Sequence, residues 1–175
     1  GYHDLETVFF PVMIKDALEI YPMDERFPSA VDCDLKVTNI PVEGDEQKNL
    51  VVKAYRQLAS RYELPRVHAH LMKAIPTQAG MGGGSSDCAY MIKALNEMCS
   101  LSMTEEEMIA EAAKLGADCP FFIMSRPAYA EGIGERLEPI ALSLAGYWLV
   151  VVRPDIPVST REAFSLVKPR PTLKK

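Results

Sequence analysis

The stretch PTQAGMGGGSS, Pro76–Ser86, contains four glycines, two serines and no charged side chain. It follows a segment with the alternation of a β-strand and precedes a segment with helical spacing. Consecutive glycines allow several backbone N–H groups to point at one anion, and a helix that begins at Ser85 or Ser86 adds the positive end of its dipole. The stretch therefore predicts a strand–loop–helix unit that binds phosphate. The simpler alternative is a flexible loop whose following helix has a serine N-cap.

Two common nucleotide-binding patterns do not fit this loop. A P-loop requires a lysine directly after its second conserved glycine. Counted from Gly80, Ser85 occupies the glycine position and Ser86 the lysine position. The dinucleotide-binding pattern G-x-G-x-x-G matches at Gly80 and Gly82 but again has Ser85 in place of its third glycine. The physics of phosphate binding fits, although neither motif does.

The rest of the chain alternates irregularly between strand and helix patterns, which is typical of an α+β domain. Thr104 and Glu107 have the spacing of a capping box at the start of a helix, and Gly116 is suited to the C′ position after it. Strands are predicted at residues 5–14, 34–40, 66–75, near 127–131 and 146–153, and helices at 49–62, from 85 or 86 to 99, and 104–115.

Composition limits the class of protein. The 175 residues suggest one domain or little more, and a net charge of -5 argues against nucleic acid as the main partner. The longest apolar run, residues 146–152, is too short to cross a membrane and predicts a buried strand. Four cysteines without C-x-x-C spacing indicate free thiols in a reducing, cytoplasmic setting.

Both ends of the sequence suggest a piece of a longer protein. The chain opens on the strand-like GYHDLETVFF without a methionine and finishes on KPRPTLKK with no element after it. We therefore expect one domain over residues 1–153 and the start of a second domain, or a linker, over 154–175.

Four ordered motifs resemble those of the GHMP kinases, a superfamily of small-molecule kinases. They are the glycine loop, GYHDLETVF at residues 1–9, LGADCPFF at 115–122 and AEGIGE at 130–135. The resemblance implies an N-terminal α+β domain of the ribosomal-protein-S5-domain-2 type and a ferredoxin-like C-terminal domain, most of which lies outside this sequence. The Pro-Ala-Lys-x-Asn strand that precedes GYH in the family is also missing, so this chain alone could be inactive.

The motifs are most similar to the branch that phosphorylates the 2-hydroxyl of cytidine diphosphate methylerythritol in the non-mevalonate isoprenoid route. That resemblance implies ATP and Mg²⁺ as cofactors, a small-molecule substrate, and a monomer or homodimer with neither nucleic acid nor membrane as a partner. Two alternatives stay open. One is a GHMP kinase for homoserine, mevalonate or a sugar, and the other is a non-catalytic nucleotide-binding module.

Asp118 is the candidate catalytic residue. It follows Gly116 and is flanked by Pro120 and two phenylalanines, surroundings that order and partly desolvate a carboxylate. A negative charge at a helix C-terminus opposes the helix dipole, which hints at a functional reason for it. The resemblance implies that Asp118 accepts the proton of the substrate hydroxyl.

The resemblance also assigns the binding residues. The ATP phosphates would lie in the loop, with Ser85 as the hydroxyl for the metal, and Lys73, Asn49 and Leu50 would lie near the adenine. Without the resemblance, Lys73 is a solvated lysine and Asn49 an ordinary N-cap. The cytidine would contact Tyr2, His3 and Phe164, of which Phe164 is otherwise a core residue. The loop residues assigned to ATP are Pro76, Thr77, Gln78, Ala79, Gly80, Met81, Gly82, Gly83, Gly84, Ser85 and Ser86.

Two further patterns carry no site. His68 and His70 form an H-x-H pair without a third ligand and are interpreted as ordinary strand residues. Glu131 and Glu135 bracket two glycines, for which a bulge or hairpin is the plainer explanation than paired catalytic carboxylates.

Overall fold

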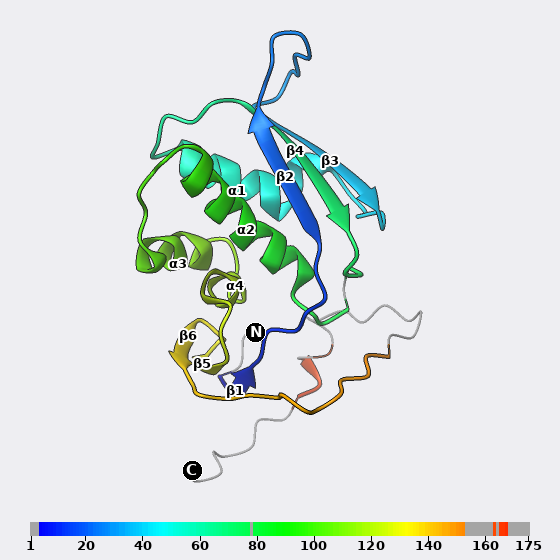
Figure 1. The fold of residues 1–175 in the computed structure, drawn as a ribbon, viewed down its shortest axis with the longest axis vertical. Coiled ribbons are helices and arrows are strands. Elements are labelled where there is room, and N and C mark those ends of the chain that lie inside the picture. Colours follow the sequence, from blue (N-terminus) through cyan, green and yellow to red (C-terminus); the bar gives the residue numbers. More distant parts are fainter. Residues whose placement is uncertain (1–3, 78, 153–162, 164, 168–175) are drawn as a thin grey trace.

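The computed structural model describes residues 4–77, 79–152, 163 and 165–167. Its helices and strands form two small sheets with helices packed between and beside them, in agreement with the predicted α+β class (Figure 1). The elements are β1 (Leu5–Phe9), β2 (Ala17–Pro22), β3 (Cys33–Asn39), a 3-10 turn η1 (Glu46–Lys48), α1 (Leu50–Ala59), β4 (Val67–Lys73), α2 (Gly83–Met98), α3 (Glu105–Ala113), α4 (Cys119–Met124), β5 (Ala128–Gly132) and β6 (Arg136–Pro139).

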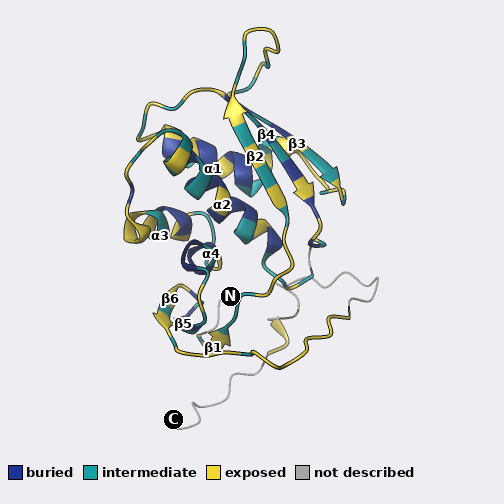
Figure 2. Cartoon of the chain, in the orientation of Figure 1, coloured by how far each residue is buried: buried dark blue, intermediate teal, exposed yellow. Residues whose placement is uncertain are grey.

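The larger sheet has the order β2-β4-β3, with β4 antiparallel to β2 and parallel to β3. Val67, Ala69 and Leu71 of β4 are buried on one face of the sheet, as the alternation in the sequence predicted. Helices α1 and α2 cover that face, whereas the other face of the sheet is exposed or half-buried (Figure 2). Strand β4 ends at the glycine loop and α2 begins after it, so the strand–loop–helix unit is confirmed.

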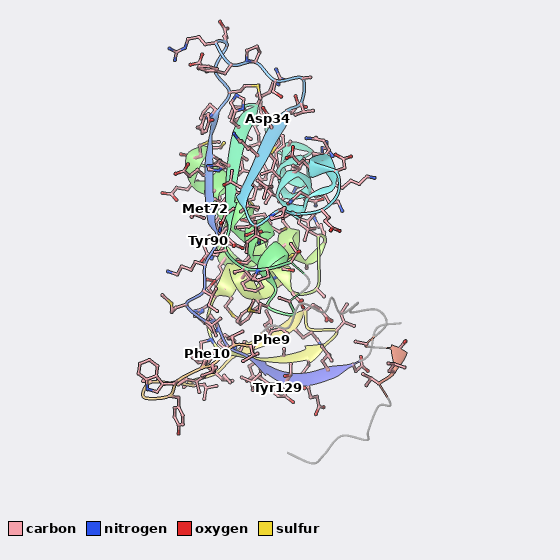
Figure 3. All side chains as sticks on the ribbon, turned by 90° about the vertical axis from the view of Figure 1, so that its right-hand side faces the viewer. Phe9, Phe10, Asp34, Met72, Tyr90 and Tyr129 are labelled. Atoms are coloured by element: carbon pink, nitrogen blue, oxygen red, sulfur yellow. The ribbon has the colours of Figure 1, made fainter. Side chains whose placement is uncertain are left out.

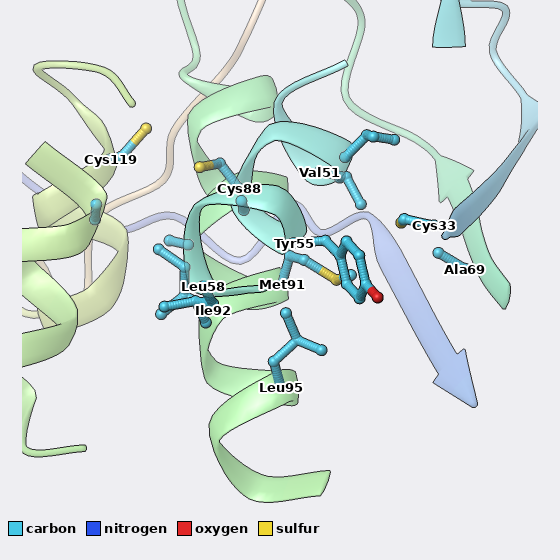
Figure 4. Close-up of a cluster of buried hydrophobic side chains, with 14 of the residues drawn as sticks. Cys33, Val51, Tyr55, Leu58, Ala69, Cys88, Met91, Ile92, Leu95 and Cys119 are labelled. Carbon is cyan, nitrogen blue, oxygen red and sulfur yellow. The ribbon is translucent and has the colours of Figure 1, made fainter. Parts of the chain in front are cut away.

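The main core lies between this sheet and the two helices. Figure 4 shows Tyr55 and Leu58 of α1 beside Met91, Ile92 and Leu95 of α2. These side chains are at most 3% exposed, and full burial of an aliphatic side chain of this size contributes about 1.5–3 kcal/mol. The core therefore fixes α2, and with it the first helical turn after the glycine loop.

The smaller sheet has the order β1-β5-β6 and is antiparallel throughout. Strands β5 and β6 form a hairpin in which Glu131 lies opposite Arg136, which confirms the hairpin expected around the two glutamates. Helix α4 packs on this sheet, and the rings of Phe9 and Phe121 meet edge to face with centroids 5.2 Å apart. This contact joins the end of β1 to the helix that follows Asp118.

Helix boundaries differ from the predictions at three places. Helix α1 ends at Ala59 and not at residue 62. Helix α2 begins at Gly83 with Gly82 as N-cap, and the prediction of a serine N-cap is wrong because the left-handed Gly82, at φ 66°, starts the helix earlier. The Thr104–Glu107 capping box of α3 is confirmed. Helix α3 ends at Ala113 with Lys114 as C-cap. Gly116 therefore lies one residue beyond C′, the position predicted for it.

The strand predicted at 146–153 is not formed over its described residues. Trp148 is 95% exposed and Val150 is 86% exposed. An apolar run becomes a buried strand only when a neighbouring strand edge and a packing face are available, and no described strand pairs with this segment. The first strand is also shorter than predicted and ends at Phe9, because Pro11 has no N–H for a strand ladder. No helix among the described residues is long and apolar enough to cross a bilayer.

Candidate active site

A cavity of about 900 Å³ lies between the glycine loop, α2, α4 and the segment that joins β1 to β2. Figure 3 shows Phe9, Phe10 and Tyr90, which belong to its lining, on the side of the molecule where these elements meet. Asp118 lines the same cavity, together with Gly80, Met81, Gly82 and Ser86 of the loop. The structure therefore brings the predicted catalytic carboxylate and the predicted phosphate loop to one site.

The loop requires glycine at specific positions. Gly80 and Gly82 have φ values of 69° and 66°, a region in which residues with a Cβ are strained. A Cβ on Gly82 would lie 2.7 Å from Cζ of Phe122, and a Cβ on Gly83 would lie 2.9 Å from Cγ2 of Ile75. The backbone of the loop is thus packed directly against α4 on one side and against the end of β4 on the other.

Asp118 occupies the N-cap position of α4, and its carboxylate does not cap that helix. The interpretation of Asp118 as a charge at a helix C-terminus is wrong, because α4 begins at the next residue and its dipole favours a negative charge there. Surrounding protein nevertheless raises the pKa of Asp118 above its ordinary value by desolvation. Gly134 of the β5–β6 turn lies beside it, since a Cβ there would be 3.7 Å from Oδ1 of Asp118.

Lys73 is buried at the base of the loop and is not the solvated lysine of the simpler interpretation. Its side chain is 3% exposed, and its ammonium lies 2.5 Å from Oδ2 of Asp16 and 2.7 Å from Oδ2 of Asp87. Neither aspartate was predicted as a site residue. Asp87 stands four residues after Gly83, one helical turn into α2, and that spacing is the signal that could have found it.

Comparison with known proteins agrees with this geometry. Residues 49–126 match the family described as GHMP kinases N terminal domain. The matched part is 78 of the 175 residues, and over it the chain is similar to the N-terminal domain of the GHMP kinases. The match spans α1, β4, the glycine loop, α2, α3 and α4, which includes the loop, Lys73 and Asp118.

Curated proteins that are similar to this chain have the same name. Proteins of Parabacteroides distasonis and Bacteroides fragilis, 48% and 49% identical over 97% of the chain, are both named 4-diphosphocytidyl-2-C-methyl-D-erythritol kinase. A relative of Porphyromonas gingivalis, 38% identical over 96% of the chain, has the same name. The chain spans about 60% of the length of these relatives.

Solved structures resemble this chain as well. A crystal structure of 4-(cytidine 5'-diphospho)-2C-methyl-D-erythritol kinase is 36% identical, with a TM-score of 0.65 over 82% of this chain and 48% of that chain. A homoserine kinase from Cytophaga hutchinsonii also has a TM-score of 0.65, over 97% of this chain and 62% of that chain, but it is 14% identical and shows the shared fold alone.

The two serines of the glycine loop have different surroundings. Ser86 lines the cavity, whereas Ser85 does not line it and interacts with Cys119 at the start of α4. Successive helix residues point about 100° apart, so the earlier start of α2 decides which serine faces the cavity. The assignment of Ser85 to the metal stays a prediction, and the geometry favours Ser86 for a hydroxyl that meets a ligand in the cavity.

The described residues fit a metal ion only in part. They contain no group of three His, Cys, Asp or Glu side chains placed to hold one. Lys73 binds one oxygen of Asp16 and one of Asp87, whereas Asp118 and the Ser86 hydroxyl are among the cavity's oxygen ligands that make no ion pair. Mg²⁺ often takes one or two protein ligands and completes its shell with phosphates and water. Binding of a magnesium ion that arrives with a nucleotide stays a prediction.

Asn49 and Leu50 do not line the cavity. Asn49 is the N-cap of α1, where its Oδ1 accepts a hydrogen bond of 2.9 Å from the N–H of Val51. A Cβ on Gly84 would lie 3.9 Å from Cδ1 of Leu50, so Leu50 borders the first turn of α2. The structure shows the ordinary capping role of Asn49, and contact of both residues with an adenine stays a prediction.

The remaining predicted site residues divide into two groups. Tyr2, His3, Gln78 and Phe164 lie outside the described residues. His68 and His70 are strand residues on the open face of the larger sheet, where His68 contacts Asp34 at 3.2 Å and His70 contacts Thr38 at 2.8 Å. Both histidines have partners within the sheet, as expected of ordinary strand residues.

Proposed function

We propose that the protein containing this chain transfers the γ-phosphoryl group of ATP to the 2-hydroxyl of 4-diphosphocytidyl-2-C-methyl-D-erythritol. The observation that carries the proposal is the presence of Asp118 and the left-handed glycine loop in one cavity. The names of relatives that are 38–49% identical support the choice of substrate. The proposal concerns the whole protein, since the chain spans about 60% of these relatives.

The loop would act by electrostatic stabilisation. Phosphoryl transfer depends mainly on positioning and on neutralising the charge of the transferred group. Backbone N–H groups around Gly80–Gly82 and at the start of α2 provide fixed donors for phosphate oxygens, and the helix dipole adds to their effect. Magnesium bound with the nucleotide would neutralise further phosphate charge, with the hydroxyl of Ser86 within the same cavity.

Asp118 would accept the proton of the attacking hydroxyl. Its surface in the cavity leaves the carboxylate accessible to a substrate, and the desolvation that raises its pKa also makes it a stronger base than an ordinary aspartate. The rings of Phe121 and Phe122 follow directly in α4 and line the same cavity. Their apolar surface would keep water away from a bound substrate, which strengthens the interaction of Asp118 with the substrate hydroxyl.

The aromatic wall of the cavity suits a substrate that carries a flat base. Phe9, Phe10 and Tyr90 add apolar surface opposite the loop. Stacking on such rings favours a pyrimidine over the smaller substrates of other GHMP kinases. Tyr2, His3 and Phe164 are proposed to contact the cytidine, in line with the sequence prediction.

The test uses the protein at its natural full length. Purified protein is incubated with ATP, Mg²⁺ and either 4-diphosphocytidyl-2-C-methyl-D-erythritol, homoserine, mevalonate or galactose, and ³¹P NMR identifies the product. We expect phosphorylation of the cytidylyl substrate with a kcat/KM at least 100-fold above that for the others. Turnover of another alcohol in its place would assign a different kinase. ATP binding by calorimetry without turnover of any of them would assign a nucleotide-binding module.

A further inference from the structure

Three charged side chains meet in the interior beneath the glycine loop. The ammonium of Lys73 lies 2.5 Å from Asp16 and 2.7 Å from Asp87, and the three side chains are 3%, 5% and 6% exposed. We refer to these residues as the Asp16–Lys73–Asp87 cluster. No other described ion pair has both partners below 10% exposure. Among the described ion pairs, only those of this cluster therefore have both charges in the interior.

Each member of the cluster belongs to a different wall of the site. Asp16 ends the segment after β1, Lys73 ends β4, and Asp87 lies in the early part of α2. Oδ1 of Asp16 also accepts hydrogen bonds from the backbone N–H groups of Ala74 and Ile75, at 2.6 and 2.8 Å. The cluster thus joins the β1–β2 connection, the entrance to the glycine loop and the helix that leaves it.

The cluster contacts the loop backbone directly. A Cβ on Gly83 would lie 3.3 Å from Nζ of Lys73, so the ammonium lies directly beside the first residue of α2. Asp16 and Asp87 line the cavity, whereas Lys73 lies behind them. A shift of the lysine would move the wall that contains Asp16 relative to the loop that contains Gly82 and Gly83.

Stability alone is a poor reason for this arrangement. A buried ion pair gains little over apolar side chains of similar volume, because the desolvation of each charge offsets the attraction. Here one cation faces two anions, and desolvation raises the pKa of Asp87 to about 6. The pKa of Asp16 is held below its ordinary value by Lys73 and by the two backbone N–H groups, although its burial opposes this. The desolvation of three charges is better explained by the positions of the chain segments that the Asp16–Lys73–Asp87 cluster holds together.

We propose that Lys73 is a positioning residue, which fixes the glycine loop relative to the β1–β2 connection on the opposite side of the cavity. The inference rests on the proposed kinase function and gives Lys73 a role other than contact with the adenine. The Lys73 side chain is 3% exposed and does not line the cavity, so it does not face a ligand bound there. Its effect on the reaction passes through Asp16, Asp87 and the backbone at Gly83.

The first experiment compares Lys73→Met with Lys73→Arg in the full-length protein. Misplacement of a reacting group by about 1 Å costs up to about 100-fold in rate. We expect Lys73→Met to lower kcat by about 10–100-fold with a smaller change in the KM for the alcohol substrate. Lys73→Arg keeps the charge and recovers part of the loss. The acid limb of the pH–kcat profile stays in place, because Asp118 is unchanged.

A second variant distinguishes the loss of positioning from a loss of folding. Lys73→Met leaves two buried carboxylates without their cation, whereas the triple variant Lys73→Met, Asp16→Asn, Asp87→Asn is uncharged and retains an acceptor for the N–H groups of Ala74 and Ile75. We expect it to fold with a Tm within about 5 °C of the parent and to keep the low kcat. The matched control is Lys114→Met. Lys114 forms an ion pair of 2.9 Å with Glu111, and neither residue lines the cavity.

Hydrogen exchange of the amides of residues 79–86, measured without substrate, separates this inference from the kinase proposal. We expect faster exchange there in the folded triple variant and parental exchange in Lys114→Met. A folded triple variant with parental kcat and parental exchange would overturn the inference. If the parent phosphorylates none of the substrates, the kinase proposal fails, and the exchange of the loop amides still decides whether Lys73 positions the loop.

Discussion

Gly82 lies so close to the ring of Phe122 that a methyl group on its Cα would come within 2.7 Å of Cζ. The contact places the phosphate loop against the helix that begins next to Asp118, although the two residues are 40 positions apart in the chain. It explains why the loop and the carboxylate share one cavity. Glycine at position 82 serves both the left-handed turn and this close packing.

Gly82→Ala and Gly80→Ala separate these two requirements. Both glycines have positive φ, which costs a residue with a Cβ about 1–2 kcal/mol, but a Cβ on Gly80 meets nothing within 4 Å. Overpacking against Phe122 adds about 1–3 kcal/mol at Gly82. We expect urea unfolding to show a larger loss for Gly82→Ala than for Gly80→Ala. Equal losses would mean that the backbone conformation alone requires glycine at position 82.

Asp118→Asn tests the general base. The pKa of Asp118 is higher in the folded protein than in the unfolded chain, so its protonated form is favoured by folding. The free energy of unfolding therefore decreases as the pH rises through that pKa. The side chain of asparagine does not ionise, so the variant lacks this loss of stability. We therefore expect Asp118→Asn to be at least as stable as the parent at pH 7 and to lose 100-fold or more in kcat. In the parent, kcat falls as the pH drops through the raised pKa, at a higher pH than an ordinary aspartate would give.

The measurements are kcat against pH and Tm against pH for both proteins. Asp118→Asn lacks the acid limb that this carboxylate produces. A folded variant with parental kcat would remove Asp118 from the chemistry and leave its place in the cavity unexplained.

The sequence predicted those parts of the site that depend on local pattern. The strand before the loop, the helix after it and the capping box at Thr104 follow from spacing within a few residues. The choice between Ser85 and Ser86 did not follow, because it depends on the residue at which α2 begins. A shift of one residue turns a side chain by about 100° around the helix axis.

The Asp16–Lys73–Asp87 cluster was beyond prediction from local pattern. Asp16 is 57 positions from Lys73 and comes from a segment with no regular structure. Only the pairing of β2 with β4 brings the two side chains together. The surroundings of Asp118 show the same limit. They depend on α4, a helix of six residues that is too short for an apolar period to predict it.

Asp87→Asn tests the cost of burying two carboxylates around one lysine. Desolvation raises the pKa of Asp87 from 3.8 in the unfolded chain to about 6 in the fold. Its protonated form is therefore favoured in the fold, and the stability that it contributes is lost as the pH rises from about 4 to about 6. We expect Asp87→Asn to become more stable relative to the parent over this range, by on the order of 2 kcal/mol.

The difference in Tm between the two proteins, measured from pH 4 to pH 7, isolates this group from the other carboxylates. Asp16 acts in the opposite direction, and its contribution is lost only below pH 3.8, outside the measured range. A difference in Tm that stays constant from pH 4 to pH 7 would show that the pKa of Asp87 is not raised in the fold.

Trp148 reports on the segment that was predicted as a buried strand. It is the only tryptophan in the sequence and is 95% exposed. Surface substitutions away from special features change stability by at most about 0.5 kcal/mol, so we expect Trp148→Ser to unfold with the parental urea midpoint in this 175-residue chain. Leu95→Ala is the matched buried control and should cost about 2–5 kcal/mol.

Fluorescence gives an independent measurement on the same chain. An exposed indole emits at long wavelength and is quenched by iodide in the folded protein as strongly as after unfolding in urea. Emission at short wavelength with protection from iodide, together with a loss of stability in Trp148→Ser comparable to that in Leu95→Ala, would show that residues 146–152 pack as the sequence pattern predicts. The exposure of Trp148 follows from the lack of a partner strand among the described residues, so the two measurements should agree.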